Sequence, residues 1–125
     1  PLYSSAASDV YKRQVFACVD SMPVRRQIFR EFCEHDWAVF LDGRMAAESL
    51  RVFCIDHNNR DAVDLYRASL FPSHEAYREG CTARATIYCA AMAAAIICAQ
   101  YKRWAMGQGA ETHLQFDLLS MDCFW

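Results

Sequence analysis

The chain has 125 residues, a formal net charge of −2, and 54% hydrophobic against 22% charged residues. This length accommodates one domain with a hydrophobic core, and this composition is typical of a globular protein and excludes a disordered one. The slightly negative charge excludes the strongly basic surface of proteins that bind nucleic acid or anionic membranes, so we expect neither as a partner.

Residues 1–14 differ from the rest of the chain. The segment PLYSSAASDVYKRQ has no initiating Met and no apolar periodicity, and it is similar to the translation of a sequencing adapter. A genuine polar tail is the alternative. We therefore treat 1–14 as a non-native or disordered leader, treat 15–125 as one domain, and expect the natural protein to begin upstream of Val15.

The first predicted element is a buried strand over Val15–Val19, which stops at a carboxylate, Asp20. Ser21 is a favoured helix cap, and Pro23 fits the first helical turn because its missing N–H costs nothing there. A carboxylate at the carboxyl end of a parallel strand faces the crevice in which open α/β sheets bind ligands. Asp20 is therefore a candidate site residue, with helix capping as the alternative role.

A helix is predicted over Met22–Glu34, because its apolar residues recur on one face. The apolar run Ala38–Leu41 predicts a strand next to 15–19 and parallel to it, with the helix as a right-handed crossover. The sequence Asp42-Gly43-Arg44 is typical of a turn. Leu50–Ile55 predicts a further strand.

Later elements follow the polar loop His57–Asp61. A short helix is expected around Ala62–Ser69 and a long one from Thr82 to about Trp104, because Thr82 can cap it. Leu114–Leu119 is the last predicted strand. This order of strands and helices predicts an α/β fold.

The long helix is unusual because Ile87–Ala99 carries no charge on any face. We expect such a helix to be covered on nearly all sides and packed on the sheet, with Ile87, Met92 and Ile96 among its most buried residues. The uncharged run 85–101 is slightly shorter than the roughly 20 residues of a membrane span and is rich in Ala, which favours a buried helix.

The seven cysteines form no C-x-x-C pair. Several lie in apolar runs, where a free thiol behaves as a small hydrophobic side chain. This usage is typical of a reducing compartment, so a cytoplasmic protein is expected. Cys81 differs because it directly precedes the long helix, and a helix N-terminus favours a nucleophilic thiolate.

Several motifs follow one another between residues 15 and 125: Cys18-Val19-Asp20-Ser21, Arg25-Arg26-Gln27, Leu41-Asp42-Gly43-Arg44-Met45, Leu50-Arg51-Val52-Phe53, Tyr66-Arg67 with Leu70-Phe71, and Cys81-Thr82-Ala83-Arg84. In this order and spacing they resemble the second half of ThiF/MoeB-type adenylyltransferases, the bacterial relatives of ubiquitin-activating enzymes. The resemblance implies a Rossmann-like mixed sheet with packed helices, incomplete because the N-terminal nucleotide-binding half is missing. It also implies a homodimer when the protein is complete.

The resemblance implies roles for individual residues. Asp20 matches the family aspartate that contacts the magnesium-bound triphosphate, so ATP and Mg²⁺ are the expected cofactors. Arg25 and Arg26 open the next helix beside the crevice, where one of them contacts phosphate or both form a solvated face. Arg44 and Arg84 flank the groove expected for the tail of the carrier protein and are candidates to hold a carboxylate or phosphate.

Cys81 matches the cysteine of the family's crossover loop, which in some members forms a thioester or persulfide link to the carrier. The alternative is a small filler side chain. Many relatives hold a structural zinc ion with two C-x-x-C pairs, the first of which flanks the Tyr-Arg dipeptide. Leu65 and Ala68 occupy those flanking positions here and cannot bind metal, so no zinc site is expected.

These implications predict a fragment of an ATP-dependent adenylyltransferase, which activates the C-terminal carboxylate of a ubiquitin-like or sulfur-carrier protein as an acyl-adenylate. The glycine-rich phosphate loop would lie before Val15, so the chain alone is expected to be inactive. One alternative is a non-catalytic interaction or dimerisation module of the same fold. The other is a cysteine hydrolase built on Cys81, His113 and Asp117.

Overall fold

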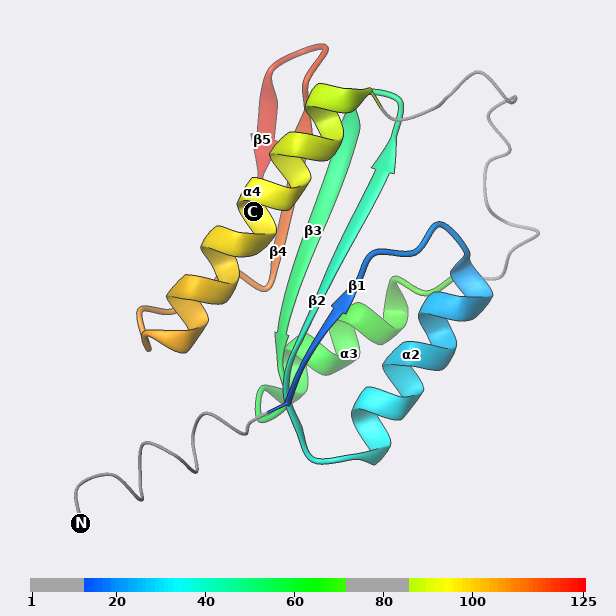
Figure 1. The fold of residues 1–125 in the computed structure, drawn as a ribbon, viewed down its shortest axis with the longest axis vertical. Coiled ribbons are helices and arrows are strands. Elements are labelled where there is room, and N and C mark those ends of the chain that lie inside the picture. The colour runs from blue at the N-terminus through cyan, green and yellow to red at the C-terminus, as the bar shows by residue number, and fades with distance from the viewer. Residues whose placement is uncertain (1–12, 72–85) are drawn as a thin grey trace.

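The computed structural model describes residues 13–71 and 86–125 (Figure 1). The elements are β1 (Arg13–Ala17), α2 (Met22–Glu34), β2 (Trp37–Ala46), β3 (Ser49–Asp56), α3 (Arg60–Ala68), α4 (Ile87–Ala105), β4 (His113–Asp117) and β5 (Asp122–Phe124). The strands form one mixed sheet in the order β1-β2-β3-β4-β5. Helices α2 and α3 cover one face and α4 covers the other, which confirms the predicted α/β class.

The β1-α2-β2 unit agrees closely with the sequence prediction. β1 and β2 are adjacent and parallel, with Ala17 opposite Asp42, and α2 has the predicted bounds. The strand is displaced, however, because it begins at Arg13 and ends at Ala17. Arg13 and Gln14, which were set aside with the leader, therefore belong to the sheet, and Cys18 and Val19 lie in the connection to α2.

The prediction of a turn at Asp42-Gly43-Arg44 is wrong. β2 continues through these residues to Ala46, pairs antiparallel with β3, and turns only at Ala47 and Glu48. Asp42 is buried between ionic partners rather than exposed in a loop. A Cβ on Gly43 would lie 2.9 Å from Ile97 Cδ1, so this glycine allows α4 to approach the strand closely.

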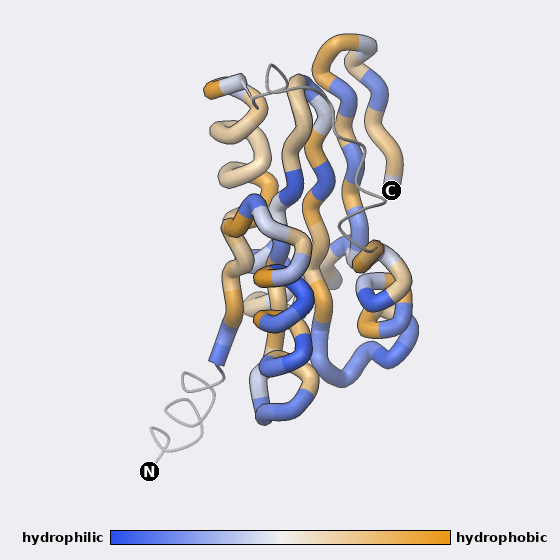
Figure 2. Tube along the Cα trace, turned by 90° about the vertical axis from the view of Figure 1, so that its right-hand side faces the viewer, coloured by the Kyte–Doolittle hydropathy of each residue, from blue (hydrophilic) through white to orange (hydrophobic). Residues whose placement is uncertain are grey.

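The sheet has a different core on each of its faces, because successive residues of a strand point to opposite sides. Hydrophobic residues run along the strands, and hydrophilic ones gather at the connections below them (Figure 2). Under α2 and α3 the core is largely aromatic and contains Phe29, Phe32, Phe40, Phe53 and Tyr66. Under α4 it is aliphatic and contains Val39, Leu41, Leu50, Val52 and Ile97.

The long helix packs on the sheet, as predicted, but with a different face. Its buried side chains are Cys89, Ala93, Ile97 and Gln100, which recur every three or four residues. Met92 and Ile96 are partly buried beside them. Ile87 is 87% exposed, so its predicted burial is wrong. A single sheet face covers only one stripe of a helix. The exposed residues of α4 therefore include Ala90, Ala91, Ala94 and Ala95. The prediction that this helix is covered on nearly all sides is wrong.

Other differences concern the ends of elements. α3 begins at Arg60 because the side chain of Asn59 accepts a hydrogen bond from the Ala62 N–H, so the polar loop is shorter than predicted. Thr86, not Thr82, caps α4 in the same way, and Thr82 lies outside the described residues.

The strand predicted over Leu114–Leu119 runs from His113 to Asp117 and turns back into the short, exposed β5, which sequence analysis missed. The helices of the described residues include none long and apolar enough to cross a membrane.

Two isoleucines on α4 test its orientation. Replacing Ile97, which is 7% exposed, with Ala leaves a cavity against the sheet. We expect the free energy of unfolding to fall by about 2–4 kcal/mol. Ile87→Ala makes the same change at a solvent-exposed site and should cost less than about 0.5 kcal/mol. Urea denaturation measures both values, and equal losses would mean that α4 presents a different face to the sheet.

Candidate functional site

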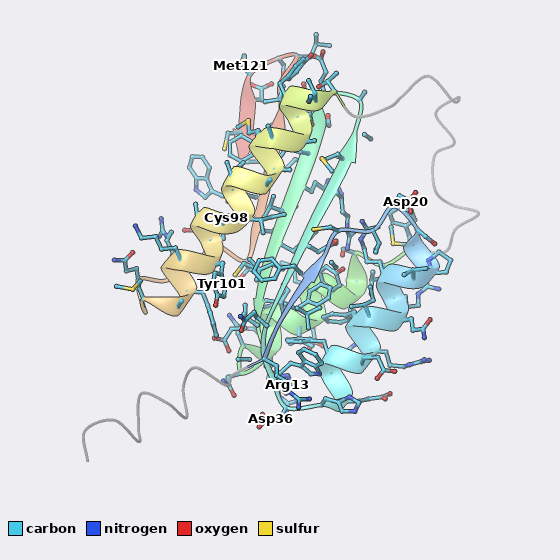
Figure 3. The ribbon with its side chains drawn as sticks, viewed as in Figure 1. Arg13, Asp20, Asp36, Cys98, Tyr101 and Met121 are labelled. Atoms are coloured by element: carbon cyan, nitrogen blue, oxygen red, sulfur yellow. The ribbon has the colours of Figure 1, made fainter. Side chains whose placement is uncertain are left out.

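Asp20 lies in the connection between β1 and α2, where a parallel strand ends and a helix begins. Its side chain is exposed to solvent, and it lies at the end of α2 opposite to Asp36 (Figure 3). The carboxyl ends of parallel strands are where α/β sheets bind their ligands. The neighbouring Ser21 occupies the cap position of α2 but makes no side-chain cap hydrogen bond.

Arg25 reaches back from α2 to the connection that carries Asp20. Its Nη2 donates to the carbonyl oxygen of Val19, and its backbone N–H donates to the carbonyl oxygen of Ser21 at 2.9 Å. A longer bond of 3.4 Å joins Nη2 to the carbonyl oxygen of Gly43. The residue is only 4% exposed. The structure therefore places the predicted phosphate contact Arg25 in the interior, where it bonds to the connection that carries Asp20.

The carboxylate of Asp42 is the centre of a buried polar group, the Asp42 cluster, formed by Arg25, Asp42, Arg44 and Tyr66. Oδ1 accepts a hydrogen bond from Arg25 Nε at 2.8 Å. Oδ2 accepts one from Arg44 Nε at 2.7 Å and one from the Tyr66 hydroxyl at 2.9 Å. Asp42 is fully buried, and a charge in that position is tolerated only when it is paired and hydrogen-bonded.

Tyr66 acts as a donor to this carboxylate. Burial, and then the negative charge of Asp42, raise the pKa of the Tyr66 hydroxyl above its ordinary value. The hydroxyl therefore keeps its proton and its bond to Asp42. Because Tyr66 comes from α3 and Arg25 from α2, one β2 carboxylate holds both helices against the sheet.

Arg44 uses its guanidinium within the protein. Besides Asp42, it donates from Nη1 to the carbonyl oxygen of Ser69 at 3.0 Å and from Nη2 to the Ser69 hydroxyl at 2.9 Å. It also lies over the Phe53 ring, 4.6 Å from the centroid, and its side chain is 12% exposed. These contacts anchor the end of α3, and a role of Arg44 in holding a substrate group remains a prediction.

Arg26 is exposed and donates to the carbonyl oxygen of Phe71 at 2.9 Å. This bond places Phe71 at the start of α2, beside the connection that carries Asp20. Thr86 donates its backbone N–H to the Ala47 carbonyl oxygen at 3.3 Å, at the turn between β2 and β3. Phe71 and Thr86 thus both lie at the end of the sheet where β1 ends. The predicted site residues Cys81 and Arg84 fall outside the described residues.

The six described cysteines are free thiols. Burial raises the pKa of Cys54 to about 12, and it also raises the pKa of Cys89. Both thiols therefore stay protonated and are poor nucleophiles. No described group of three or more His, Cys, Asp or Glu side chains is arranged to hold a metal ion, and Leu65 and Ala68 are exposed on α3. The expected lack of a zinc site remains a prediction.

His113 and Asp117, the two described residues of the proposed cysteine hydrolase, are placed unfavourably for catalysis. His113 and Asp117 lie four residues apart on β4, which separates their Cα atoms by about 13 Å in an extended strand. Burial, and then Arg51 and Arg44, lower the pKa of His113, which stacks on Phe53. Asp117 accepts a hydrogen bond from the Ser49 hydroxyl at 3.0 Å. Neither residue orients the other as a catalytic pair requires.

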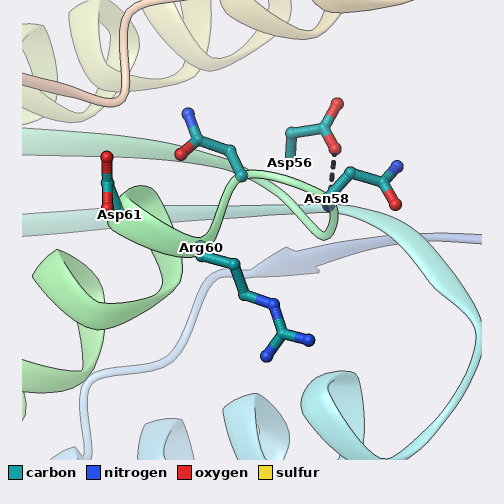
Figure 4. A pocket seen from close by; sticks show the side chains of 5 residues that line it. Asp56, Asn58, Arg60 and Asp61 are labelled. Atoms are coloured by element: carbon teal, nitrogen blue, oxygen red, sulfur yellow. Dashed lines mark hydrogen bonds between the residues drawn. The ribbon is translucent and has the colours of Figure 1, made fainter.

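A surface pocket lies at the other end of the sheet. It is lined by Asp56, Asn58, Asn59, Arg60 and Asp61, with the Asn58 N–H donating to Asp56 Oδ1 at 2.8 Å (Figure 4). Asp56 pairs with Val39 near the start of β2, whereas Asp20 follows the end of β1. Carboxylates and an arginine share this open pocket, so its charge favours no single class of ligand. No predicted site residue lines it.

Sequence analysis missed the Asp42 cluster. The available signal was a carboxylate that directly continues the apolar run Ala38–Leu41, with Arg44 two residues further on. The sequence Asp-Gly is a common turn pattern, however, and local pattern alone does not distinguish it from a buried ion pair. The partners Arg25 and Tyr66 are 17 and 24 residues away in the chain, so only the fold brings them together.

The Asp42 cluster predicts a large effect on stability. Asp42→Asn leaves Arg25 and Arg44 without their counter-charge, and we expect a loss of about 3–5 kcal/mol in the free energy of unfolding. Asp64→Asn is the control. It breaks the exposed ion pair between Asp64 and Arg67, whose N–O distance is 2.6 Å. That loss should stay below about 1 kcal/mol. Urea denaturation measures both, and similar losses would refute the importance of the buried pair.

Comparison with known proteins identifies no family for this chain. No protein-family model matches the chain, and no curated protein matches it.

Proposed function

We propose that residues 15–125 are the C-terminal part of an ATP-dependent adenylyltransferase of the ThiF/MoeB type. The observation that carries the proposal is the exposed carboxylate of Asp20 in the short connection between the parallel strand β1 and the helix α2. The order of the sequence motifs supports it, because Asp20 is the residue that matches the family's metal-contacting aspartate.

The chemistry of Asp20 fits magnesium. Mg²⁺ is a hard cation that prefers oxygen ligands, and it is commonly held by one or two carboxylates together with phosphate oxygens. Bound Mg-ATP would supply an activated α-phosphate and a pyrophosphate leaving group. Asp20 would hold the metal, and Arg26, at the start of the same helix, would remain near enough to face the phosphates. The proposed cofactors are therefore ATP and Mg²⁺.

The phosphate-binding half is proposed to lie upstream of Val15, in a Rossmann-like sheet. β1 stands at one end of the sheet order, and its edge away from β2 can accept a further parallel strand. Phe16 on this strand is 44% exposed and packs edge-on against Tyr101 of α4, which leaves apolar surface at that edge. Residues 15–125 alone should therefore show no exchange of pyrophosphate into ATP, and activity of this fragment would contradict the proposal.

The proposed substrate is the C-terminal carboxylate of a ubiquitin-like or sulfur-carrier protein, which attacks the α-phosphate to give an acyl-adenylate and pyrophosphate. Arg84 is proposed to help bind the carrier tail, and the Cys81 thiolate to attack the acyl-adenylate, which forms a thioester and releases AMP. In the sequence both fall between Phe71 and Thr86, and hydrogen bonds hold these two flanking residues at the same end of the sheet as Asp20.

A non-catalytic interaction or dimerisation module is the second candidate, and the surface of α4 favours it. The outer face of this helix exposes Ala90, Ala91, Ala94, Ala95 and Cys98 and carries no charge along that stretch. Uncharged surface of this kind is typical of protein contacts. A complete protein that forms a stable dimer but lacks all carrier-dependent exchange would favour this candidate.

Asp20→Asn in the complete protein tests the metal role. Loss of the carboxylate removes charge from the proposed metal site, and we expect carrier-dependent pyrophosphate–ATP exchange to fall by about a hundredfold, as when other groups that stabilise developing charge are lost. Asp36→Asn, at the opposite end of α2, is the control and should retain full activity (Figure 3). Normal exchange by Asp20→Asn with an unchanged fold would refute the role.

Cys81→Ala separates adenylation from any covalent step. Pyrophosphate exchange should survive, because the acyl-adenylate forms without a protein nucleophile. The covalent adduct between carrier and enzyme should disappear from intact-mass spectra recorded without reducing agent. An adduct that persists in Cys81→Ala would assign the nucleophile to another residue.

A further inference from the structure

Arg25 contacts the backbone of the two residues that flank Asp20. Its guanidinium holds the carbonyl oxygen of Val19, the preceding residue. Its backbone N–H holds the carbonyl oxygen of Ser21, the following residue, at 2.9 Å as the first hydrogen bond of α2. The backbone that carries the exposed Asp20 carboxylate is therefore fixed from both directions by one buried residue.

Asp42 in turn fixes the guanidinium of Arg25. The two side chains are 5% and 0% exposed and are joined at 2.8 Å. The register of the sheet places Asp42 beside Ala17, the last residue of β1, so the ion pair is anchored where the strand ends. Asp42 is itself held by Arg44 and Tyr66 through its other oxygen, Oδ2, which leaves Oδ1 to Arg25.

We propose that Arg25 is the positioning residue for Asp20, and that Asp42 orients Arg25 for this purpose. The proposal rests on the metal role of Asp20 and assigns Arg25 an indirect part in it. Arg25 is 4% exposed, and its Nε and Nη2 already donate to protein oxygens. It therefore acts through the backbone at Asp20 and not as a ligand of the nucleotide.

The geometry also explains why the residue is arginine. A planar guanidinium donates in two directions at once, here to the Asp42 carboxylate and to the Val19 carbonyl oxygen. Lysine carries the same charge at a single nitrogen, and it cannot span both acceptors in this fixed arrangement. Replacing a residue that orients a metal ligand typically weakens metal binding 10- to 100-fold.

The test uses Arg25→Lys in the complete protein, with Mn²⁺ as a paramagnetic substitute for Mg²⁺ in the presence of ATP. The Kd for Mn²⁺, measured by electron paramagnetic resonance, should rise about tenfold or more. Excess Mg²⁺ should restore most of the exchange activity, because the variant keeps the carboxylate of Asp20 but holds it less well. A merely structural defect would not respond to the metal concentration.

Tyr66→Phe is the matched control. It removes the hydrogen bond to Asp42 Oδ2 and loosens the same cluster, but no hydrogen bond of the Tyr66 side chain reaches Arg25 or Val19. Its Kd for Mn²⁺ should stay within about twofold of the wild type, since metal affinity follows the groups that orient the ligand. An equal rise in Tyr66→Phe would overturn the positioning role, because general loosening would then explain the effect.

Two further results distinguish this proposal from the proposed function. Unchanged Mn²⁺ binding in Arg25→Lys, together with weakened binding in Asp20→Asn, would overturn the role of Arg25 alone. Unchanged binding in Asp20→Asn would overturn both. A crystal structure of the wild type with Mg-ATP needs no variant: Arg25 should still hold the Val19 carbonyl oxygen, and direct contact of Arg25 with the triphosphate would refute the positioning role.

Discussion

The fully buried carboxylate of Asp42 is the constraint on which the rest of the structure depends. A charge in a protein interior is tolerated only with compensating partners. Asp42 has three: Arg25 of α2, Arg44 of its own strand and Tyr66 of α3. These bonds fix how both helices lie on the sheet. Arg25 and Arg44 also donate to the backbone carbonyl oxygens of Val19 and Ser69, which lie in the connections after β1 and α3.

The two faces of the sheet are held by different means. The face that carries the Asp42 cluster is filled with interlocking aromatic rings, with Tyr66 4.4 Å from Phe29 and 5.0 Å from Phe40 between centroids. The opposite face is aliphatic and relies on close approach, with Gly43 leaving space for Ile97 of α4. Directional polar contacts on one face and close packing on the other hold the helices against both sides of the sheet.

The groups that surround Asp20 lie at one end of the sheet. Arg26 bonds to Phe71 beside the connection that carries Asp20, and the Asp42 cluster lies behind this connection, where β1 ends. An exposed carboxylate backed by a buried polar cluster suits the metal role proposed for Asp20, because a metal ligand that is held in place binds better. The pocket at Asp56 carries mixed charge, and the carboxylate of Asp56 is already held by the Asn58 N–H and by Trp104 Nε1.

Local sequence determined much of the fold. The apolar runs and the Ser21–Pro23 start signal were sufficient to place α2, because these features depend on short-range propensity. The parallel pairing of β1 and β2 followed from the rule that a helix between two strands crosses over between parallel neighbours. Sequence also singled out Asp20 through its place after a strand. Tertiary structure decided the rest. It turned Asp42-Gly43-Arg44 from an expected turn into the centre of a strand, and it selected the Cys89–Ala93–Ile97 stripe of α4 over Ile87. Both outcomes depend on partners distant in sequence, whose charge or shape compensates for what the local pattern disfavours.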